Sequence, residues 1–186
     1  MNTLWESFES WLKIHCTECL SQLKPPATST EIEILEKHLH VTLPSDFIDF
    51  LKIHNGQIPD DFWLIKGSEL LSSERIMDEW SVWNDLWLDN TFEENTTQRG
   101  NGVKDDWWNP KWIPFTYDGS GNHLCIDLDP ASNGTYGQII EMWHDDEYRP
   151  IVAKSFTQWF QTYTKELQNG KYYYDVEYCA IIEEEE

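Results

Sequence analysis

The stretch that decides the fold is Leu43-Pro44-Ser45-Asp46-Phe47-Ile48-Asp49-Phe50-Leu51-Lys52-Ile53-His54-Asn55-Gly56. It predicts one short helix with both ends specified. Pro44 suits the first helical position, where a missing N–H costs nothing, and Asp46 complements the positive end of the helix dipole. Asn55-Gly56 supplies a left-handed stop. The side chains between these signals are spaced three and four residues apart and therefore share one apolar face: Phe47, Phe50, Leu51 and His54.

Upstream and downstream segments predict further helices. An apolar stripe over residues 4–22 indicates a first helix that ends at Pro25-Pro26. Thr30 and Glu33 have the spacing of a capping box, which opens a second helix. From about residue 73, four large apolar side chains recur every three or four residues and indicate a helix with an aromatic stripe: Ile76, Trp80, Trp83 and Trp87. Residues 90–110 read as a long exposed loop.

The apolar period changes from helical to alternating at Trp112. Turn residues then divide the chain into strands at about 112–117, 122–128 and 136–143. Shorter strands are expected near 60–65 and 151–153, and an edge strand within 172–182. Ser155 and Gln158 form a capping-box pair that begins a last helix. The sequence therefore predicts an α+β fold, in which an antiparallel sheet of about four to six strands is packed with helices.

Length and charge limit the class of protein. The 186 residues favour a single domain, and the 11 Trp, 8 Tyr and 8 Phe give it large core side chains. The formal net charge of −21 opposes binding to nucleic acid or to an anionic membrane and attracts a cationic protein. An alternative is that the acidity keeps an aromatic-rich chain soluble. The chain has neither a secretory signal pattern nor an apolar run long enough for a membrane span.

A cytoplasmic location is therefore expected. In that compartment the four cysteines would remain reduced, so the sequence predicts no disulfide. Cys16 and Cys19 have Cys-x-x-Cys spacing, but both fall within the predicted first helix, where packing is the simpler interpretation.

The strand at 122–129 carries the strongest candidates for chemistry. Alternation places His123, Cys125, Asp127 and Asp129 on one face, and His144 on a neighbouring strand end could join them. Residues two apart on a strand diverge by about 7 Å, which is too far for one metal ion. The polar outer face of a half-buried strand explains the pattern better. Asp118, Ser120, Asn122 and Asp129 have the spacing of ligands in a calcium-binding loop. The loop would require a glycine at the position that His123 occupies, which argues against calcium. We therefore expect no metal, no cofactor and no enzymatic activity.

Several blocks, in this order, resemble the SUKH superfamily: residues 43–56, Trp112-Ile113-Pro114-Phe115, residues 118–130 and Gly137-Gln138-Ile139-Ile140. Its bacterial members are mostly immunity proteins that neutralise a cognate toxin, and its fungal members include the Smi/Knr cell-wall regulators. The resemblance implies a core at residues 28–170, preceded by an N-terminal helix at 1–24 and followed by a disordered acidic tail at 183–186. Ser120 stands where many relatives have glycine.

Two functions follow from this resemblance. The leading hypothesis is a non-enzymatic immunity protein that binds a basic, nuclease-type toxin through an acidic surface. The alternative is a regulatory protein–protein interaction module like the fungal relatives. Acidic loops flanked by aromatic residues supply the expected partner-binding set: Asp60, Asp61, Trp63, Glu93, Glu94, Asp105, Asp106, Trp107, Trp108, Trp143, Asp145, Asp146, Glu147 and Tyr148.

Overall fold

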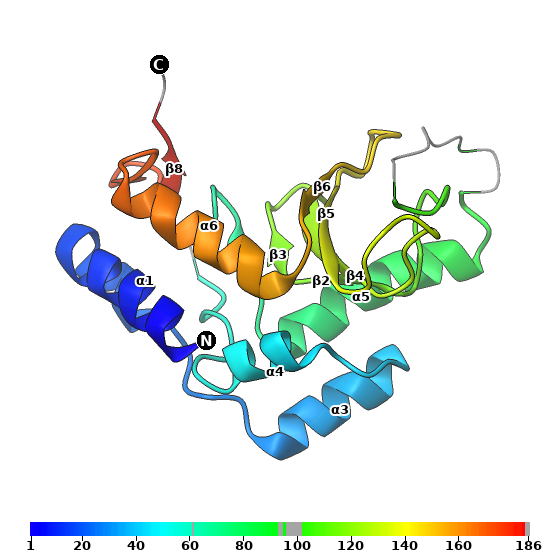
Figure 1. Ribbon diagram of the computed structural model, residues 1–186, viewed down its shortest axis with the longest axis horizontal. Coiled ribbons are helices and arrows are strands. Elements are labelled where there is room, and N and C mark those ends of the chain that lie inside the picture. Colours follow the sequence, from blue (N-terminus) through cyan, green and yellow to red (C-terminus); the bar gives the residue numbers. More distant parts are fainter. Residues whose placement is uncertain (61, 93–94, 96–101, 185–186) are drawn as a thin grey trace.

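The computed structural model describes residues 1–60, 62–92, 95 and 102–184 (Figure 1). In these residues an antiparallel four-stranded sheet is surrounded by helices, which confirms the predicted α+β class. The helices are α1 (Asn2–His15), α2 (Thr17–Ser21), α3 (Ser29–Leu39), α4 (Ser45–Leu51), α5 (Ser73–Leu88) and α6 (Phe156–Gln168). The strands are β1 (Glu69–Leu70), β2 (Trp112–Pro114), β3 (Thr116–Tyr117), β4 (His123–Asp127), β5 (Gln138–Met142), β6 (Ile151–Ala153), β7 (Tyr172–Asp175) and β8 (Ala180–Glu183).

The main sheet has the strand order β2-β4-β5-β6, and all its neighbours are antiparallel. Cys125 at its centre pairs with Pro114 on one side and Ile140 on the other. Two small hairpins, β1-β3 and β7-β8, flank this sheet. The predicted strand at 112–117 is divided because Phe115 leaves the β2 register, although its N–H still donates to the Leu124 carbonyl at 2.9 Å.

Helices cover the sheet from different sides. Helix α6 packs against β5 and β6, whereas α5 packs against β2 and, on its other side, against α3. Figure 1 shows α6 in orange above α4, and α3 in blue at the bottom of the view. Most residues of the central strands β4 and β5 are therefore buried, whereas the paired residues Leu124 and Glu141 are partly exposed.

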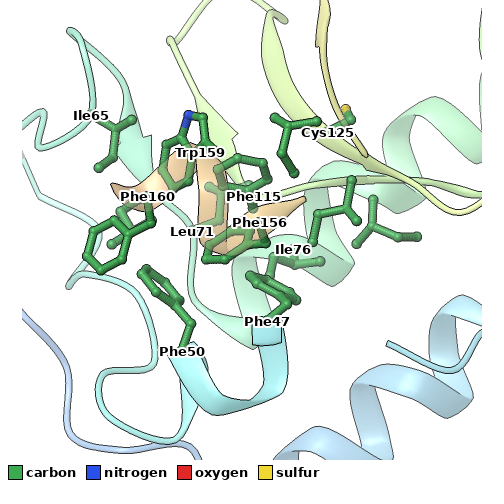
Figure 2. Close-up of a cluster of buried hydrophobic side chains, with 14 of the residues drawn as sticks. Phe47, Phe50, Ile65, Leu71, Ile76, Phe115, Cys125, Phe156, Trp159 and Phe160 are labelled. Atoms are coloured by element: carbon green, nitrogen blue, oxygen red, sulfur yellow. The ribbon is translucent and has the colours of Figure 1, made fainter. Parts of the chain in front are cut away.

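The opening stretch lies in the aromatic core, as its pattern predicts. Phe47 and Phe50 of α4 meet Phe156 and Phe160 of α6, and Figure 2 shows these rings grouped beside Phe115. The ring centroids of Phe50 lie 4.7 Å from Phe156 and 5.0 Å from Phe160. These edge-to-face pairs add about 0.5–1.5 kcal/mol each to the burial of their apolar area.

Helix α1 contributes to the same core. The indole N–H of Trp5 donates to the Phe50 carbonyl at 3.2 Å, and the Trp5 ring lies 5.2 Å from Phe160. Phe8 lies against Phe160 as well, at 5.9 Å. The N-terminal helix is thus packed onto α4 and α6.

Helix α4 is shorter than its sequence suggests. Pro44 is the N-cap instead of the first helical residue, and the helix ends at Leu51 instead of continuing to Asn55. Gly56 has a positive φ of +67°, but its role is close packing, because a Cβ there would lie 2.4 Å from the Leu71 carbonyl oxygen. The Asn55 side chain bonds to Ser73 and so connects this turn to the start of α5.

Helix α3 is capped by a different pair from the predicted one. Thr28 and Glu31 form the capping box, with the Thr28 N–H donating to Glu31 Oε2 at 2.7 Å. The spacing Thr-x-x-Glu occurs twice in succession, and the earlier copy is used. The buried face of α3 consists of Ile32, Leu35 and Leu39.

Two predictions at the edges of the fold differ from the structure. Around the predicted strand at 60–65, Trp63 and Ile65 form only isolated bridges, and Asp61 lies outside the described residues. The predicted disordered tail at 183–186 is wrong for Glu183, which ends β8, and the Glu184 N–H donates to the Lys171 carbonyl. Residues 185–186 lie outside the described part of the chain. None of the helices within the described residues has the length and apolar character to cross a bilayer.

Candidate functional site

The polar side chains of β4 are buried, which corrects the prediction that they form an outer face. His123, Cys125 and Asp127 are 3%, 0% and 0% exposed. Trp83 of α5 covers His123 and donates its indole N–H to His123 Nε2 at 3.1 Å, while Gln138 of β5 donates to the Asp127 carboxylate. Alternation identified two distinct faces correctly, but the polar face is as enclosed as the apolar one.

His123 is held in one neutral form by its neighbours. Its Nδ1 lies 2.7 Å from the Thr116 carbonyl, which can only accept, while its Nε2 faces the Trp83 indole, which can only donate. The imidazole must therefore carry its proton on Nδ1 and accept at Nε2. Burial lowers the pKa of His123 to about 4. A ring with both nitrogens satisfied inside the protein has no free position for a metal or a substrate.

Asp127 has hydrogen-bond partners within the protein, and Cys125 is buried away from solvent. Gln138 donates to Asp127 Oδ2 at 2.8 Å, the Asp129 N–H donates to Oδ1, and burial raises the pKa of Asp127. Burial also raises the pKa of the Cys125 thiol, which keeps it protonated and unreactive. Among the residues that the structure describes, no three potential ligands converge as a metal site would require.

The apparent calcium loop is a hydrogen-bonded turn. Asp118 accepts from the backbone and side chains of Ser120 and Asn122, at 2.6–3.0 Å. Burial alone would raise the pKa of Asp118, but these donors outweigh burial and lower it. Asp129 is paired instead with Lys104 at 2.5 Å and with Asn109. The four predicted ligands therefore belong to two separate networks.

The prediction of reduced thiols is wrong for Cys16 and Cys19, which form a disulfide. The predicted first helix is broken at Cys16, whose φ of −153° and ψ of 86° are not helical. Cys16 then caps α2, and its sulfur accepts from the Cys19 N–H. Both cysteines of the disulfide are buried. The other two, Cys125 and Cys179, are free thiols.

Arg149 joins two of the predicted acidic segments. Arg149 is 1% exposed, and its guanidinium donates from Nη1 to the carbonyls of Asp146 and Tyr148 and from Nη2 to the Trp107 carbonyl at 3.0 Å. The same group lies 5.2 Å from the centroid of the Trp107 ring. Burial lowers the pKa of Arg149. A buried cation bound to backbone carbonyls thus holds residues 104–107 beside the β5-β6 turn at 143–148.

We call these two segments, residues 104–107 and 143–148, the tip–loop surface. It carries eight of the predicted partner-binding residues: Asp105, Asp106, Trp107, Trp143, Asp145, Asp146, Glu147 and Tyr148. Trp143 and Tyr148 are 53% and 49% exposed, so two large aromatic rings lie among carboxylates. Anchors of this kind are typical of protein-binding surfaces.

The remaining predicted residues lie elsewhere. Trp108 is 2% exposed and packs against Trp83, so it belongs to the core. Trp63 borders Gly119 in the turn at 118–121, which is not part of the tip–loop surface. Asp60 is exposed three residues before Trp63. Asp61, Glu93 and Glu94 lie outside the described residues.

Sequence reasoning missed Arg149, the residue that assembles this surface. Its signal is weak, because a single Arg after an acidic turn looks like a local counterion. Its partner Trp107 is 42 positions away along the chain. Only the folded chain shows that the Arg149 guanidinium binds backbone carbonyls from both segments.

Comparison with known proteins identifies the family. A profile of the SMI1 / KNR4 family (SUKH-1) matches residues 26–162. The chain is 25% identical to a glucan synthesis regulatory protein of Neurospora crassa, over 92% of this chain and 39% of that protein. It is 28% identical to the cell wall biosynthesis/cell cycle regulator smi1 of Schizosaccharomyces pombe, over 92% of this chain and 37% of that protein.

The cell wall assembly regulator SMI1 of Saccharomyces cerevisiae is 23% identical, over 91% of this chain and 41% of its own length. The chain therefore spans about two fifths of these curated relatives. Their names describe regulators, which supports the regulatory alternative better than the immunity hypothesis. Because the profile covers well over half of its residues, the chain belongs to the SMI1 / KNR4 family (SUKH-1).

Proposed function

We propose that this chain is a non-enzymatic, regulatory protein–protein interaction module. Two observations support the proposal. The relatives named above are regulators of cell-wall and glucan synthesis. The polar candidates for chemistry already have hydrogen-bond partners inside the fold. His123 is bonded to Trp83 and Thr116, and Asp127 accepts from Gln138.

The tip–loop surface is the docking site in this proposal, and its partner is a protein with a basic surface. The carrying observation is the Arg149 bridge, which joins the acidic segment that ends at Trp107 to the acidic turn that carries the exposed rings of Trp143 and Tyr148. Carboxylates around an aromatic anchor attract cationic side chains at long range, and the anchor then supplies short-range affinity. The net charge of −21 extends the attraction beyond the site itself.

Charge steering predicts how the binding kinetics depend on salt. The association rate with the partner should fall steeply as salt is added, while the dissociation rate changes little. A salt-independent association rate would contradict steering by the acidic surface.

A variant with three neutralised side chains tests the location: Asp145→Asn, Asp146→Asn and Glu147→Gln. The amide introduced by Asp146→Asn retains an oxygen that can accept from the Tyr148 N–H, so the turn is preserved. The matched control removes three charges from other exposed positions: Glu6→Gln, Glu33→Gln and Glu177→Gln. Cross-linking to partners in native extract should be lost in the first variant and retained in the second. Equal loss in both would assign the effect to net charge alone.

A cellular experiment separates regulation from toxin immunity. Deleting the gene in cells that contain no cognate toxin should disturb growth or the cell envelope if the module is regulatory. Normal growth of the deletion, together with rescue of cells from a basic nuclease toxin by co-expression, would instead favour the immunity hypothesis and reject the regulatory one.

A further inference from the structure

A groove runs between α3 and α5, with a cavity volume of about 930 Å³. Its apolar surface comes from Ile34 and Leu39 of α3, from Trp80 and Trp87 of α5, and from Pro110. Ile34 and Trp87 remain 51% and 44% exposed, although each has apolar neighbours in the groove. Large apolar side chains exposed in a concave surface are typical of peptide-binding grooves.

The charge of this groove is opposite to that of the whole chain. Its positively charged lining residues are Lys37 and Lys111, against a single carboxylate from Asp85. The side chains of His38 and His40 also line it. Among the described residues, no carboxylate forms an ion pair with Lys37 or Lys111. In a protein with 34 acidic and 13 basic residues, a hollow lined by two lysines and one carboxylate favours a negatively charged occupant.

Contacts between the two helices hold the groove in shape. His38 Nε2 lies 2.9 Å from Ser81 Oγ, and the His38 ring lies against Trp80 at 5.6 Å. His40 ends α3 in a left-handed conformation, and its carbonyl accepts from Lys111 Nζ at 2.6 Å. A preformed groove loses little conformational entropy on binding, which favours affinity.

Trp87 lines this groove and also borders a second hollow lined by Asp105 and Asp106. A bound segment would place its acidic residues near Lys37 and Lys111, and its bulky apolar side chain against the exposed ring of Trp87.

We propose that the groove binds a segment of a partner protein in which a bulky apolar side chain is accompanied by Asp or Glu residues. This docking site differs from the tip–loop surface, because its charge preference is reversed. The two sites would let the module hold two partners, or two regions of one partner, with opposite charges.

The test selects ligands without assuming a partner. Random peptides of about 15 residues, long enough for about four helical turns, are displayed on phage and selected on the intact chain. Selected peptides should be enriched in Asp or Glu next to Trp, Phe, Leu or Ile. Their affinity should fall about tenfold in the double variant Lys37→Glu/Lys111→Glu, and by a similar factor in Trp87→Ala.

The control makes the same charge change at exposed positions away from the groove, Lys13→Glu/Lys154→Glu, and should bind nearly as the parent does. A second control reverses the charge of the peptide. When its acidic residues are replaced by Lys, the peptide should bind the Lys37→Glu/Lys111→Glu variant more tightly than the parent. Circular dichroism verifies that each variant is folded, and Lys37→Gln/Lys111→Gln replaces the double reversal if it is not.

Three results would overturn the proposal. The first is selection of peptides with no acidic enrichment, and the second is binding that the groove variants leave unchanged. The third is self-association of the chain that Trp87→Ala abolishes in sedimentation, which would make a second copy the occupant.

Discussion

The guanidinium of Arg149 lies over the indole of Trp107 and also binds the Trp107 backbone carbonyl, so one buried cation uses both the ring and the main chain of one residue. The same guanidinium donates to the carbonyls of Asp146 and Tyr148, which places the acidic loop at 104–107 against the β5-β6 turn. The arrangement of the candidate docking surface therefore depends on this side chain.

Replacing Arg149 with Met should separate the two acidic segments. We expect faster amide hydrogen exchange in residues 104–108 and 143–148, with a loss of about 1–3 kcal/mol in the free energy of unfolding, because charge-assisted hydrogen bonds disappear. Arg149→Lys keeps the charge but lacks the planar fork and should also speed this exchange. Unchanged exchange in both variants would show that the segments are held together by other contacts.

His123 should make the protein less stable in acid. Its pKa is lowered from 6.5 to about 4 in the folded state, so below pH 6.5 the unfolded chain takes up a proton that the folded chain refuses. Stability from this group is complete above pH 6.5 and is lost as the pH falls toward 4, by up to about 3 kcal/mol.

Urea unfolding at pH 7 and pH 4.5 measures this loss, and His123→Gln should reduce the difference between the two pH values. Nitrogen NMR of the imidazole provides a direct check, with a proton expected on Nδ1 at pH 5. An imidazolium signal at that pH would contradict the neutral form deduced from Trp83 and Thr116.

Two glycines with positive φ should respond differently to alanine. Gly170→Ala meets no atom within 4 Å and should cost only the backbone penalty of about 1–2 kcal/mol. Gly56→Ala has a similar φ, but its Cβ would meet the Leu71 carbonyl, so the cost should exceed about 3 kcal/mol. Chemical denaturation measures both, and equal costs would mean that the contact at Leu71 relaxes freely.

Cys16 and Cys19 should resist alkylation until a reductant is added. In denaturant without reductant, iodoacetamide should label Cys125 and Cys179, and after reduction it should label all four cysteines. Mass spectrometry of the peptide containing residues 16 and 19 reports the result. Labelling of all four cysteines without reductant would show that Cys16 and Cys19 are reduced, as the sequence predicts.

Local signals in the sequence predict much of the fold. The apolar spacing of residues 43–56 identifies α4 and its buried face, because helix periodicity depends on neighbours three and four positions away. The change from a helical to an alternating period at Trp112 identifies the sheet, because residues two apart on a strand lie on the same face. Boundaries are harder to predict, because Thr28-x-x-Glu31 and Thr30-x-x-Glu33 carry the same capping signal, and packing selects the first.

The candidate sites depend on contacts that are distant along the chain. Alternation separates the two faces of β4, but only Trp83, 40 positions earlier, reveals that the His123 face is covered. The tip–loop surface needs Arg149 to reach Trp107, and the α3–α5 groove combines Lys37 with Lys111. Such pairings follow from the topology of the sheet, which no single stretch of residues specifies.

The enclosure of β4 from both sides has a practical consequence for protein engineering. A strand whose side chains are engaged on both faces tolerates little change, so new binding specificity must be built outside it. The turn at 143–148 projects beyond the sheet and is anchored at its base by Arg149. Replacement turns that retain Arg149 could therefore be grafted there to redirect this scaffold to other targets.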